Sequence, residues 1–150
     1  MDFDLSVAQH ETRAAEHARV GDVLLDRDEE WATVLYFYSA YHLIKAALLA
    51  DPVFDDPKAC MAKHLALSMQ DRWTEAHKGR VVKGRRERWG VNDLVALLYK
   101  PLSAPYEVLH QASLEVRYGP GLLAGTPTDA QESLDKIHTD YHTGLVVAVP

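Results

Sequence analysis

The chain has 150 residues, of which 47% are hydrophobic, so it can bury the core of one ordinary domain without support from a metal or a disulfide. Its single cysteine, Cys60, excludes an intramolecular disulfide framework and suits a reducing compartment. The net charge of −6 argues against a general nucleic-acid coat protein. The first residues are acidic and contain no apolar signal-peptide core, so we expect a cytoplasmic protein.

The segment from Leu5 to Leu25 is predicted to form a helix, because its small apolar residues keep a rough helical spacing and no proline interrupts it. Its apolar face is mostly alanine, which favours close packing against a bulky neighbour. On another face, His10, Arg13 and His17 lie together. A short charged link follows at positions 26–30, and a link of this length predicts an antiparallel helix pair.

The most apolar run in the chain extends from Trp31 to Leu49. Two adjacent apolar stripes with helical spacing predict a central helix that is buried around most of its circumference. Its tyrosines, together with Ser39, His42 and Lys45, are too polar for a membrane span, so no membrane association is expected. We interpret His42 as a core histidine that holds a neighbour's polar group.

The middle of the chain is less regular. Prolines at positions 52 and 57 end the central helix, because proline cannot continue the ladder of backbone hydrogen bonds. A weaker helical pattern runs from Lys58 to Ala76. After it come six cations against one carboxylate, Glu87, which gives this stretch a net charge of +5 and leaves −11 on the rest of the chain. Three glycines accompany these charges, so we expect a mobile, solvated loop at about 78–90.

The last third of the chain predicts three further helices: a short one at Asp93 to Lys100, a longer one at Pro105 to Tyr118, and a final one that opens with a capping box at Thr128 and Gln131. No strand and no internal repeat is predicted. The expected fold is therefore all-α, an up-and-down helical bundle of four to five helices that forms a single domain over residues 1–150.

Two motifs resemble those of HEPN domain proteins, all-α bundles of prokaryotic toxin–antitoxin and antiviral systems. The first is the run W-x-x-V-L-x-F-Y-S-A-Y-H-L-x-x-A-x-L, from Trp31 to Leu48. The second, weaker motif joins Tyr106-Glu-Val-Leu109 to Ala112-Ser113 and Val116-Arg117-Tyr118. The resemblance covers most of the chain outside residues 51–90. It implies an HEPN-like bundle that forms a homodimer.

Many HEPN proteins are metal-independent ribonucleases whose signature is an arginine followed, after four to six residues, by a histidine. The resemblance therefore implies that Arg72 and His77 are the catalytic pair if this chain is an enzyme. The position departs from the family pattern, however. The arginine that corresponds to the family's late helix is Arg117, and no histidine follows it at that spacing. In addition, a chain of this composition is expected to contain about one arginine–histidine pair at this spacing by chance.

The leading prediction is therefore a non-catalytic binding or regulatory module, in a defence or toxin–antitoxin setting, without a cofactor. RNA, a nucleotide-bearing partner or an acidic protein partner would contact the basic loop. The residues predicted to bind nucleic acid are its six cations, Lys78, Arg80, Lys83, Arg85, Arg86 and Arg88. The alternative of a plain solvated loop stays open, because no aromatic residue interleaves with them before Trp89.

A third possibility is a metal-binding bundle. His138 and His142 lie four residues apart on one face of the last predicted helix, a spacing that can place two imidazoles on one metal ion. A third ligand would have to come from another helix, from His10, His17 or His42. Two exposed histidines on a polar helix face are the commoner arrangement, so no metal site is predicted and this pair is kept only as a weak candidate.

Overall fold

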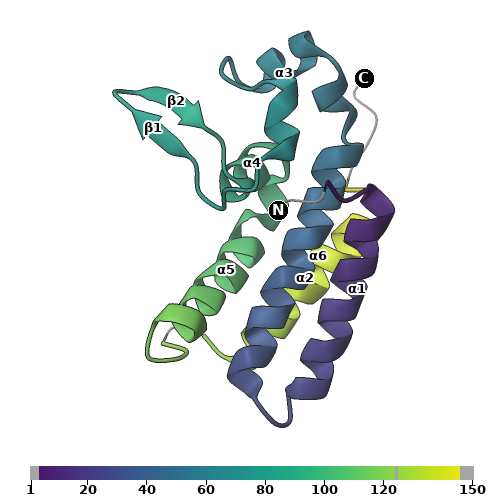
Figure 1. Ribbon diagram of the computed structural model, residues 1–150, viewed down its shortest axis with the longest axis vertical. Coiled ribbons are helices and arrows are strands. Elements are labelled where there is room, and N and C mark those ends of the chain that lie inside the picture. The colour runs from purple at the N-terminus through teal and green to yellow at the C-terminus, as the bar shows by residue number, and fades with distance from the viewer. Residues whose placement is uncertain (1–3, 124, 146–150) are drawn as a thin grey trace.

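The computed structural model describes residues 4–123 and 125–145. Four long helices run alternately along one axis and form an up-and-down bundle (Figure 1). They are α1 (Val7–Leu24), α2 (Glu29–Ala50), α5 (Ser103–Tyr118) and α6 (Pro127–His142). The prediction of an all-α helical bundle is confirmed.

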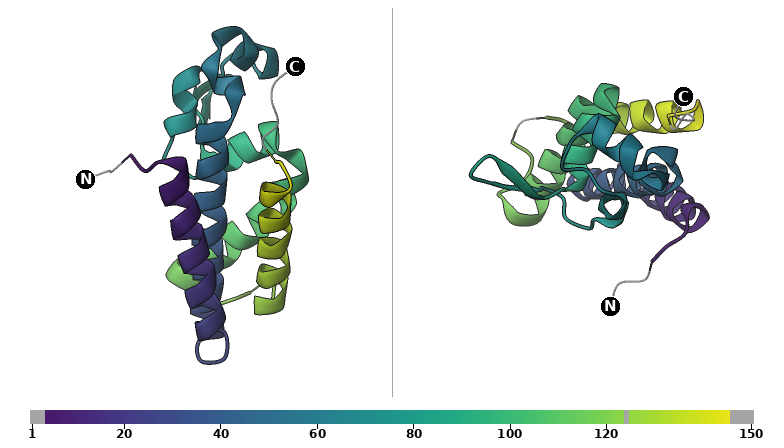
Figure 2. Two further views of the ribbon diagram at one scale, coloured as in Figure 1. Left: turned by 90° about the vertical axis from the view of Figure 1, so that its right-hand side faces the viewer. Right: turned by 90° about the horizontal axis from the view of Figure 1, so that it is seen from above.

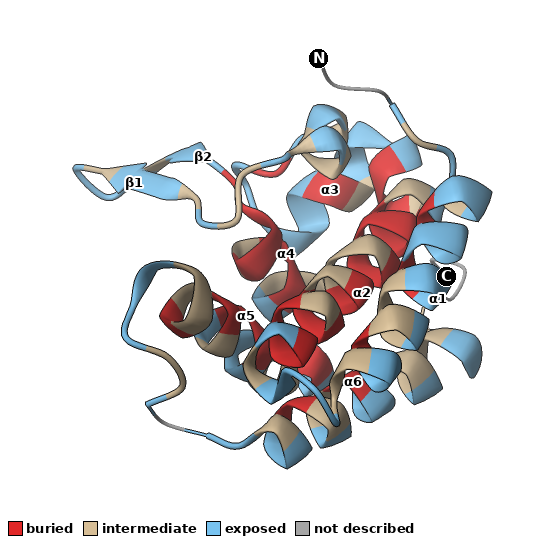
Figure 3. Ribbon diagram, turned by 60° about the horizontal axis from the view of Figure 1, so that its bottom comes forward, coloured by how far each residue is buried: buried red, intermediate tan, exposed pale blue. Residues whose placement is uncertain are grey.

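Helix α2 lies at the centre of the bundle, where it contacts α1, α5 and α6 (Figure 2). Most of its positions are buried, as its apolar sequence predicts (Figure 3). The exception is Trp31, the first residue of the apolar run, which is 47% exposed at the N-terminal end of the helix. There, the side chain of Asp28 caps the helix by accepting a hydrogen bond from the backbone of Trp31. The helix ends at Ala50, before Pro52.

Helix α1 packs closely on α2, in agreement with its alanine-rich face. It begins with a capping box in which the Ser6 side chain accepts from Gln9 N and the Gln9 side chain accepts from Ser6 N. The aromatic ring of Tyr36 fills the space beside Gly21, where an added Cβ would lie 2.7 Å from a ring carbon. The Tyr36 hydroxyl donates a 2.7 Å hydrogen bond to Asp22, so this contact is both apolar and polar.

No described helix combines the length and the apolar character that crossing a membrane requires.

The chain between α2 and α5 forms a separate group of short elements at one end of the bundle (Figure 1). Its short helices are the α-helices α3 (Pro57–Lys63) and α4 (Val91–Leu98) and the 3-10 helices η1 (Pro52–Asp55), η2 (Met69–Trp73) and η3 (Lys100–Leu102). The helix that we expected from Lys58 to Ala76 is thus divided into α3 and η2. The backbone of His64 is extended, and Leu65, on the expected apolar stripe, is 83% exposed.

The expected loop at 78–90 is instead a β-hairpin, so the prediction that the chain contains no strand is wrong. Strands β1 (Arg80–Val82) and β2 (Arg85–Arg88) pair antiparallel, with Val82 opposite Arg85 and Val81 opposite Arg86. The two-residue turn between the strands consists of Lys83 and Gly84, which have φ of 51° and 76°. Positive φ at both central positions is the turn geometry that matches the twist of a hairpin.

The last helix begins earlier than the sequence suggested. Its capping box is formed by Thr126 and Asp129, in place of Thr128 and Gln131, and Pro127 occupies the first helical position. Three of its residues, Ala130, Leu134 and Ile137, are buried in the core, where α6 contacts α2 and α5.

Candidate nucleic-acid interface

Residues 78–90, here named the basic hairpin, extend away from the helical bundle (Figures 1 and 3). Their base is fixed to the start of α4 by backbone hydrogen bonds. Asp93 Oδ2 accepts hydrogen bonds from Gly79 N at 2.7 Å and from Gly90 N at 3.0 Å. Directly below, Val91 N donates to Ala76 O and Asn92 N donates to His77 O. The two ends of the hairpin are therefore held together and attached to the bundle.

Gly90 is needed for this attachment because the two ends of the hairpin touch at its Cα. A Cβ on Gly90 would lie 2.4 Å from the backbone carbonyl carbon of Lys78 and 2.5 Å from the backbone nitrogen of Gly79. Neither atom belongs to a side chain that could rotate away. Only glycine therefore allows the chain to leave the bundle and return at the same place.

The six cations of the basic hairpin are not equivalent. Arg86 is largely structural: its side chain is 20% exposed, lies 4.3 Å above the Trp89 ring and is 3.4 Å from Asp93. Arg80 lies 3.3 Å from Glu87 on the exposed surface, a pair that solvent weakens. Within the described residues, the remaining four cations form no salt bridge with a carboxylate: Lys78, Lys83, Arg85 and Arg88.

The hairpin offers charge but no platform for stacking bases. Trp89 is the aromatic residue nearest to the cations, and it is 5% exposed, with its indole nitrogen bonded to the carbonyl of Ala66. Contacts with a nucleic acid would therefore go to phosphate groups, which carry no sequence information. The acidic remainder of the chain would repel the same polyanion and orient the hairpin towards it.

The structure separates the two residues of the predicted catalytic pair. The guanidinium of Arg72 donates to the carbonyls of Leu48, Leu49 and Asp51 and contacts Asp55 at 2.8 Å. It thereby satisfies the free carbonyls at the C-terminal end of α2.

His77 packs against an earlier part of α2, with its ring 5.6 Å from the ring of Phe37 and 5.4 Å from that of Tyr41. Tyr41 and Leu48, which mark the positions of His77 and Arg72, are about 10 Å apart along the helix axis. The imidazole and the guanidinium therefore do not meet. The sequence spacing suggested that they would, but Thr74, directly after η2, has extended ψ, so the segment from Arg72 to His77 is not one helix.

His77 instead lies beside His110 of α5, with 5.0 Å between the ring centroids. His110 is 2% exposed, stacks on Phe37 and accepts a 2.8 Å hydrogen bond at Nδ1 from the side-chain amide of Asn92. Burial, with smaller contributions from His77, Lys78 and Arg117, lowers the pKa of His110 to about 4. Burial also lowers the pKa of His77, again with Arg117 contributing. Both imidazoles are therefore neutral near pH 7.

The sequence reasoning missed His110. Its spacing of seven residues from Arg117 places both side chains on the same face of α5, and this signal was available. Arg117 donates a 2.8 Å hydrogen bond to the hydroxyl of Tyr38 and lies over the Tyr38 ring. Its partners are thus this hydroxyl, the backbone carbonyl of Ser113 and the aromatic faces of Tyr38 and Tyr118.

The weak metal candidates have other contacts. His138 Nε2 lies 3.0 Å from the hydroxyl of Ser39, which itself donates to the carbonyl of Ala14. The rings of His138 and His142 are 5.8 Å apart. Across residues 4–123 and 125–145, no three histidine, cysteine, aspartate or glutamate side chains are arranged to hold a metal ion.

The other histidines form a separate cluster between α1 and α2. His10 and His42 approach to 2.9 Å between their Nδ1 atoms, and the ring of His17 stacks on that of His42. Burial lowers the pKa of both His10 and His42 to about 4, and that of His17 also falls. His42 does contact a neighbour's polar group, the imidazole of His10, but it is partly exposed and is not the core histidine that we expected.

Comparison of the chain with protein-family models, curated proteins and solved structures found no match. The resemblance to HEPN domains stays a prediction.

Proposed function

We propose that the protein is a non-catalytic module that binds the phosphate backbone of nucleic acid through the basic hairpin. The observation that carries the proposal is the hairpin itself. Four of its cations form no salt bridge with any carboxylate in the part of the chain that the structure describes, and Asp93 fixes the hairpin that carries them to the bundle. Because this element is ordered before binding, less conformational entropy is lost on association than with a mobile loop.

Three features favour a nucleic acid over an acidic protein. Two of the four cations that carry the proposal, Arg85 and Arg88, are arginines, whose planar guanidinium groups suit bidentate contacts with phosphate. On the two strands, Val81 is exposed and Val82 is partly exposed, so there is little apolar area for a protein interface core. The remainder of the chain carries −11, which favours a partner that is contacted by the hairpin alone.

The test is a comparison of two variants that lose the same charge. The first replaces Lys78, Lys83, Arg85 and Arg88 by alanine, all on the basic hairpin. The matched control replaces Arg13, Lys58, Lys63 and Lys100, which are exposed and lie outside it. With labelled single-stranded RNA at low salt, fluorescence anisotropy should show binding that the hairpin variant weakens about ten-fold or more and that the control retains.

Equal weakening by both variants would mean that only net charge matters and would contradict the assignment to the hairpin. No binding of RNA or DNA by the wild type would overturn the proposal and leave an acidic protein as the partner to seek.

A ribonuclease is the second candidate, and one observation favours it: the adjacent neutral imidazoles of His77 and His110, near Arg117. Two imidazoles can share the proton transfers of RNA cleavage, one as base and one as acid. Such an enzyme would use His77 with His110, without Arg72. The burial of His110 weighs against it, because a substrate atom would need to reach a side chain that is 2% exposed.

The same RNA incubations distinguish the candidates when they contain a chelator. Cleavage by the wild type that is lost in His77→Ala would make the protein a metal-independent ribonuclease. Intact RNA with retained binding is the result that the binding module predicts.

The oligomeric state, the cellular compartment and the biological system of the protein are part of the same proposal. A homodimer in a cytoplasmic defence or toxin–antitoxin system is supported by the HEPN resemblance of the two motifs, and a reducing compartment is supported by the lone Cys60.

A further inference from the structure

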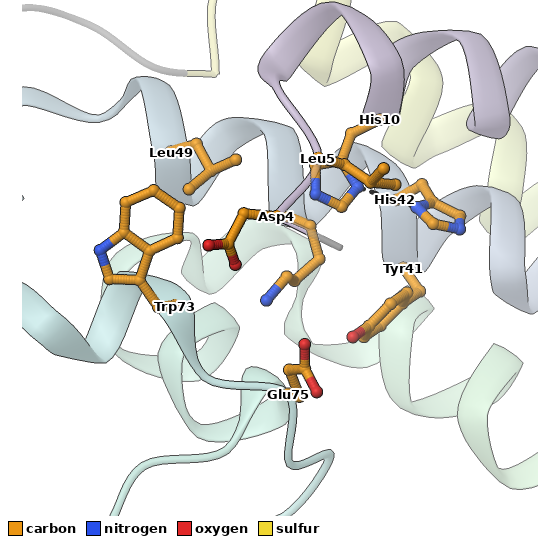
Figure 4. A pocket seen from close by; sticks show the side chains of 9 residues that line it. Asp4, Leu5, His10, Tyr41, His42, Leu49, Trp73 and Glu75 are labelled. Carbon is orange, nitrogen blue, oxygen red and sulfur yellow. Dashed lines mark hydrogen bonds between the residues drawn. The ribbon is translucent and has the colours of Figure 1, made fainter. Parts of the chain in front are cut away.

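A pocket distinct from the basic hairpin opens between α1, α2 and the segment that follows η2 (Figure 4). Its volume is about 150 Å³, similar to that of a cavity that can hold one benzene molecule. It is lined by Asp4, Leu5, His10, Tyr41, His42, Lys45, Leu49, Trp73 and Glu75. Trp73 is 51% exposed and so forms part of the rim through which a ligand would pass.

Lys45 is the unusual member of this pocket. It lies in the last third of the apolar helix α2 and is 6% exposed, although lysine is almost never buried without a partner. Its ammonium group has three N–H donors, and one of them bonds the backbone carbonyl of Thr74. The carboxylates of Glu75 and Asp4 attract its charge, but burial has the larger effect, and the pKa of Lys45 is lowered.

The groups around this amine can transfer protons. Burial, with a smaller contribution from the positive charge of Lys45, lowers the pKa of His10 in α1 and of His42 in α2 to about 4. Both imidazoles are therefore neutral near pH 7. Figure 4 shows the hydroxyl of Tyr41 and the carboxylate of Glu75 directed towards the middle of the pocket. The pocket therefore contains a buried amine, two neutral imidazoles and the carboxylates of Asp4 and Glu75.

We propose that Lys45 captures a small, uncharged aldehyde or ketone in this pocket by forming an imine. The size of the cavity limits the ligand to a few non-hydrogen atoms. Asp4 and Glu75 would repel an anionic carbonyl compound, so we take the ligand to be uncharged. A carbonyl compound is also the class with which a lysine amine reacts directly.

The reaction needs no co-reactant beyond the amine and the carbonyl compound. Because the pKa of Lys45 is lowered, its ammonium group loses a proton to water more readily than that of a surface lysine, which leaves Nζ with a free electron pair. Nζ attacks the carbonyl carbon, a C–N bond forms, and the electron pair of the C=O double bond moves to oxygen, which takes up a proton. The resulting carbinolamine loses its hydroxyl group as water, and a C=N bond to Lys45 remains.

The test uses the full chain with propionaldehyde as probe and cyanoborohydride to reduce the imine to a stable adduct. Peptide mapping by mass spectrometry then gives the rate of labelling at each lysine. At neutral pH, Lys45 should be labelled about ten-fold or more faster than any of the other six lysines, although it is the most buried. Labelling of Lys45 at the same rate as the surface lysines, or slower, would overturn the proposal.

A pocket-filling variant separates capture in the pocket from general reactivity. Leu49→Trp should fill the cavity and remove the preference for Lys45, while the labelling of exposed Lys136 stays as in the wild type. A preference that survives this substitution in a folded variant would show that the pocket is not what selects the aldehyde. If the variant does not fold, the wild-type rates decide the question by themselves.

Discussion

Phe37→Ala should destabilise the protein by about 3–5 kcal/mol, the largest effect that we expect from a single substitution. Phe37 is fully buried at the centre of α2, and its loss would leave a cavity that several rings line together. Those rings belong to Tyr38, Tyr41, His77, Tyr106 and His110. Because they come from three different parts of the chain, they cannot all move inward to fill the space. Urea unfolding monitored by circular dichroism measures the change.

Leu65→Ala is the matched control for this prediction. It also shortens a large apolar side chain, but Leu65 is 83% exposed, so its free energy of unfolding should change by less than about 0.5 kcal/mol. A loss below about 1 kcal/mol in Phe37→Ala would contradict the central position that the structure gives to this ring.

The free energy of unfolding should fall by about 3 kcal/mol between pH 7 and pH 4 through His110 alone. The pKa of His110 is about 4 in the folded protein, against about 6.5 in an unfolded chain. The unfolded state therefore binds a proton from about pH 6.5 downward, while the folded state does not. By linkage, stability is present above pH 6.5 and is lost as the pH falls towards 4.

His110→Gln isolates this contribution, because glutamine fills part of the space and does not titrate. Urea unfolding at pH 7 and pH 4 should show a fall in stability that is about 3 kcal/mol smaller in His110→Gln than in the wild type, whatever the two stabilities are at pH 7. Leu65→Ala, on an exposed position without a titratable group, should keep the wild-type fall. An identical fall in all three proteins would mean that His110 titrates alike in the folded and unfolded states.

The helical part of the fold could be predicted because the spacing of apolar residues along each segment indicates both a helix and the face that it buries. Helix α2 is apolar on nearly all sides and lies at the centre, and the alanines and Gly21 of α1 allow the close approach that Tyr36 occupies. The ends of helices were predicted less accurately. The last helix starts at Pro127, because Thr126 and Asp129 cap it more effectively than the Thr128 and Gln131 that we chose.

The basic hairpin was missed because its strands carry arginines. A half-buried strand is predicted from alternating apolar residues, which these strands lack. Its turn residues, Lys83 and Gly84, gave only a weak hairpin signal. What holds the hairpin is Asp93, whose contacts with Gly79 and Gly90 are set by the tertiary structure. A sequence pattern does not show such contacts.

The candidate sites were predicted in part. The cations of the hairpin could be read from composition, but the sequence could not show that Arg86 is engaged with Trp89 and Asp93. The pairing of Arg72 with His77 rested on spacing, and the structure instead pairs His77 with His110, which is 33 positions away. Lys45 was noted only as a polar residue of α2, because nothing local indicates that a pocket surrounds it.

The most direct test of the central claim is the salt dependence of RNA binding by the wild type and by the alanine variant of Lys78, Lys83, Arg85 and Arg88. Four phosphate contacts on a single strand predict that the logarithm of the binding constant falls with the logarithm of salt concentration with a slope of about −3. The variant should bind more weakly, with a slope closer to zero. A wild type that does not bind at low salt, or a slope that the variant leaves unchanged, would contradict the assignment of nucleic-acid binding to the basic hairpin.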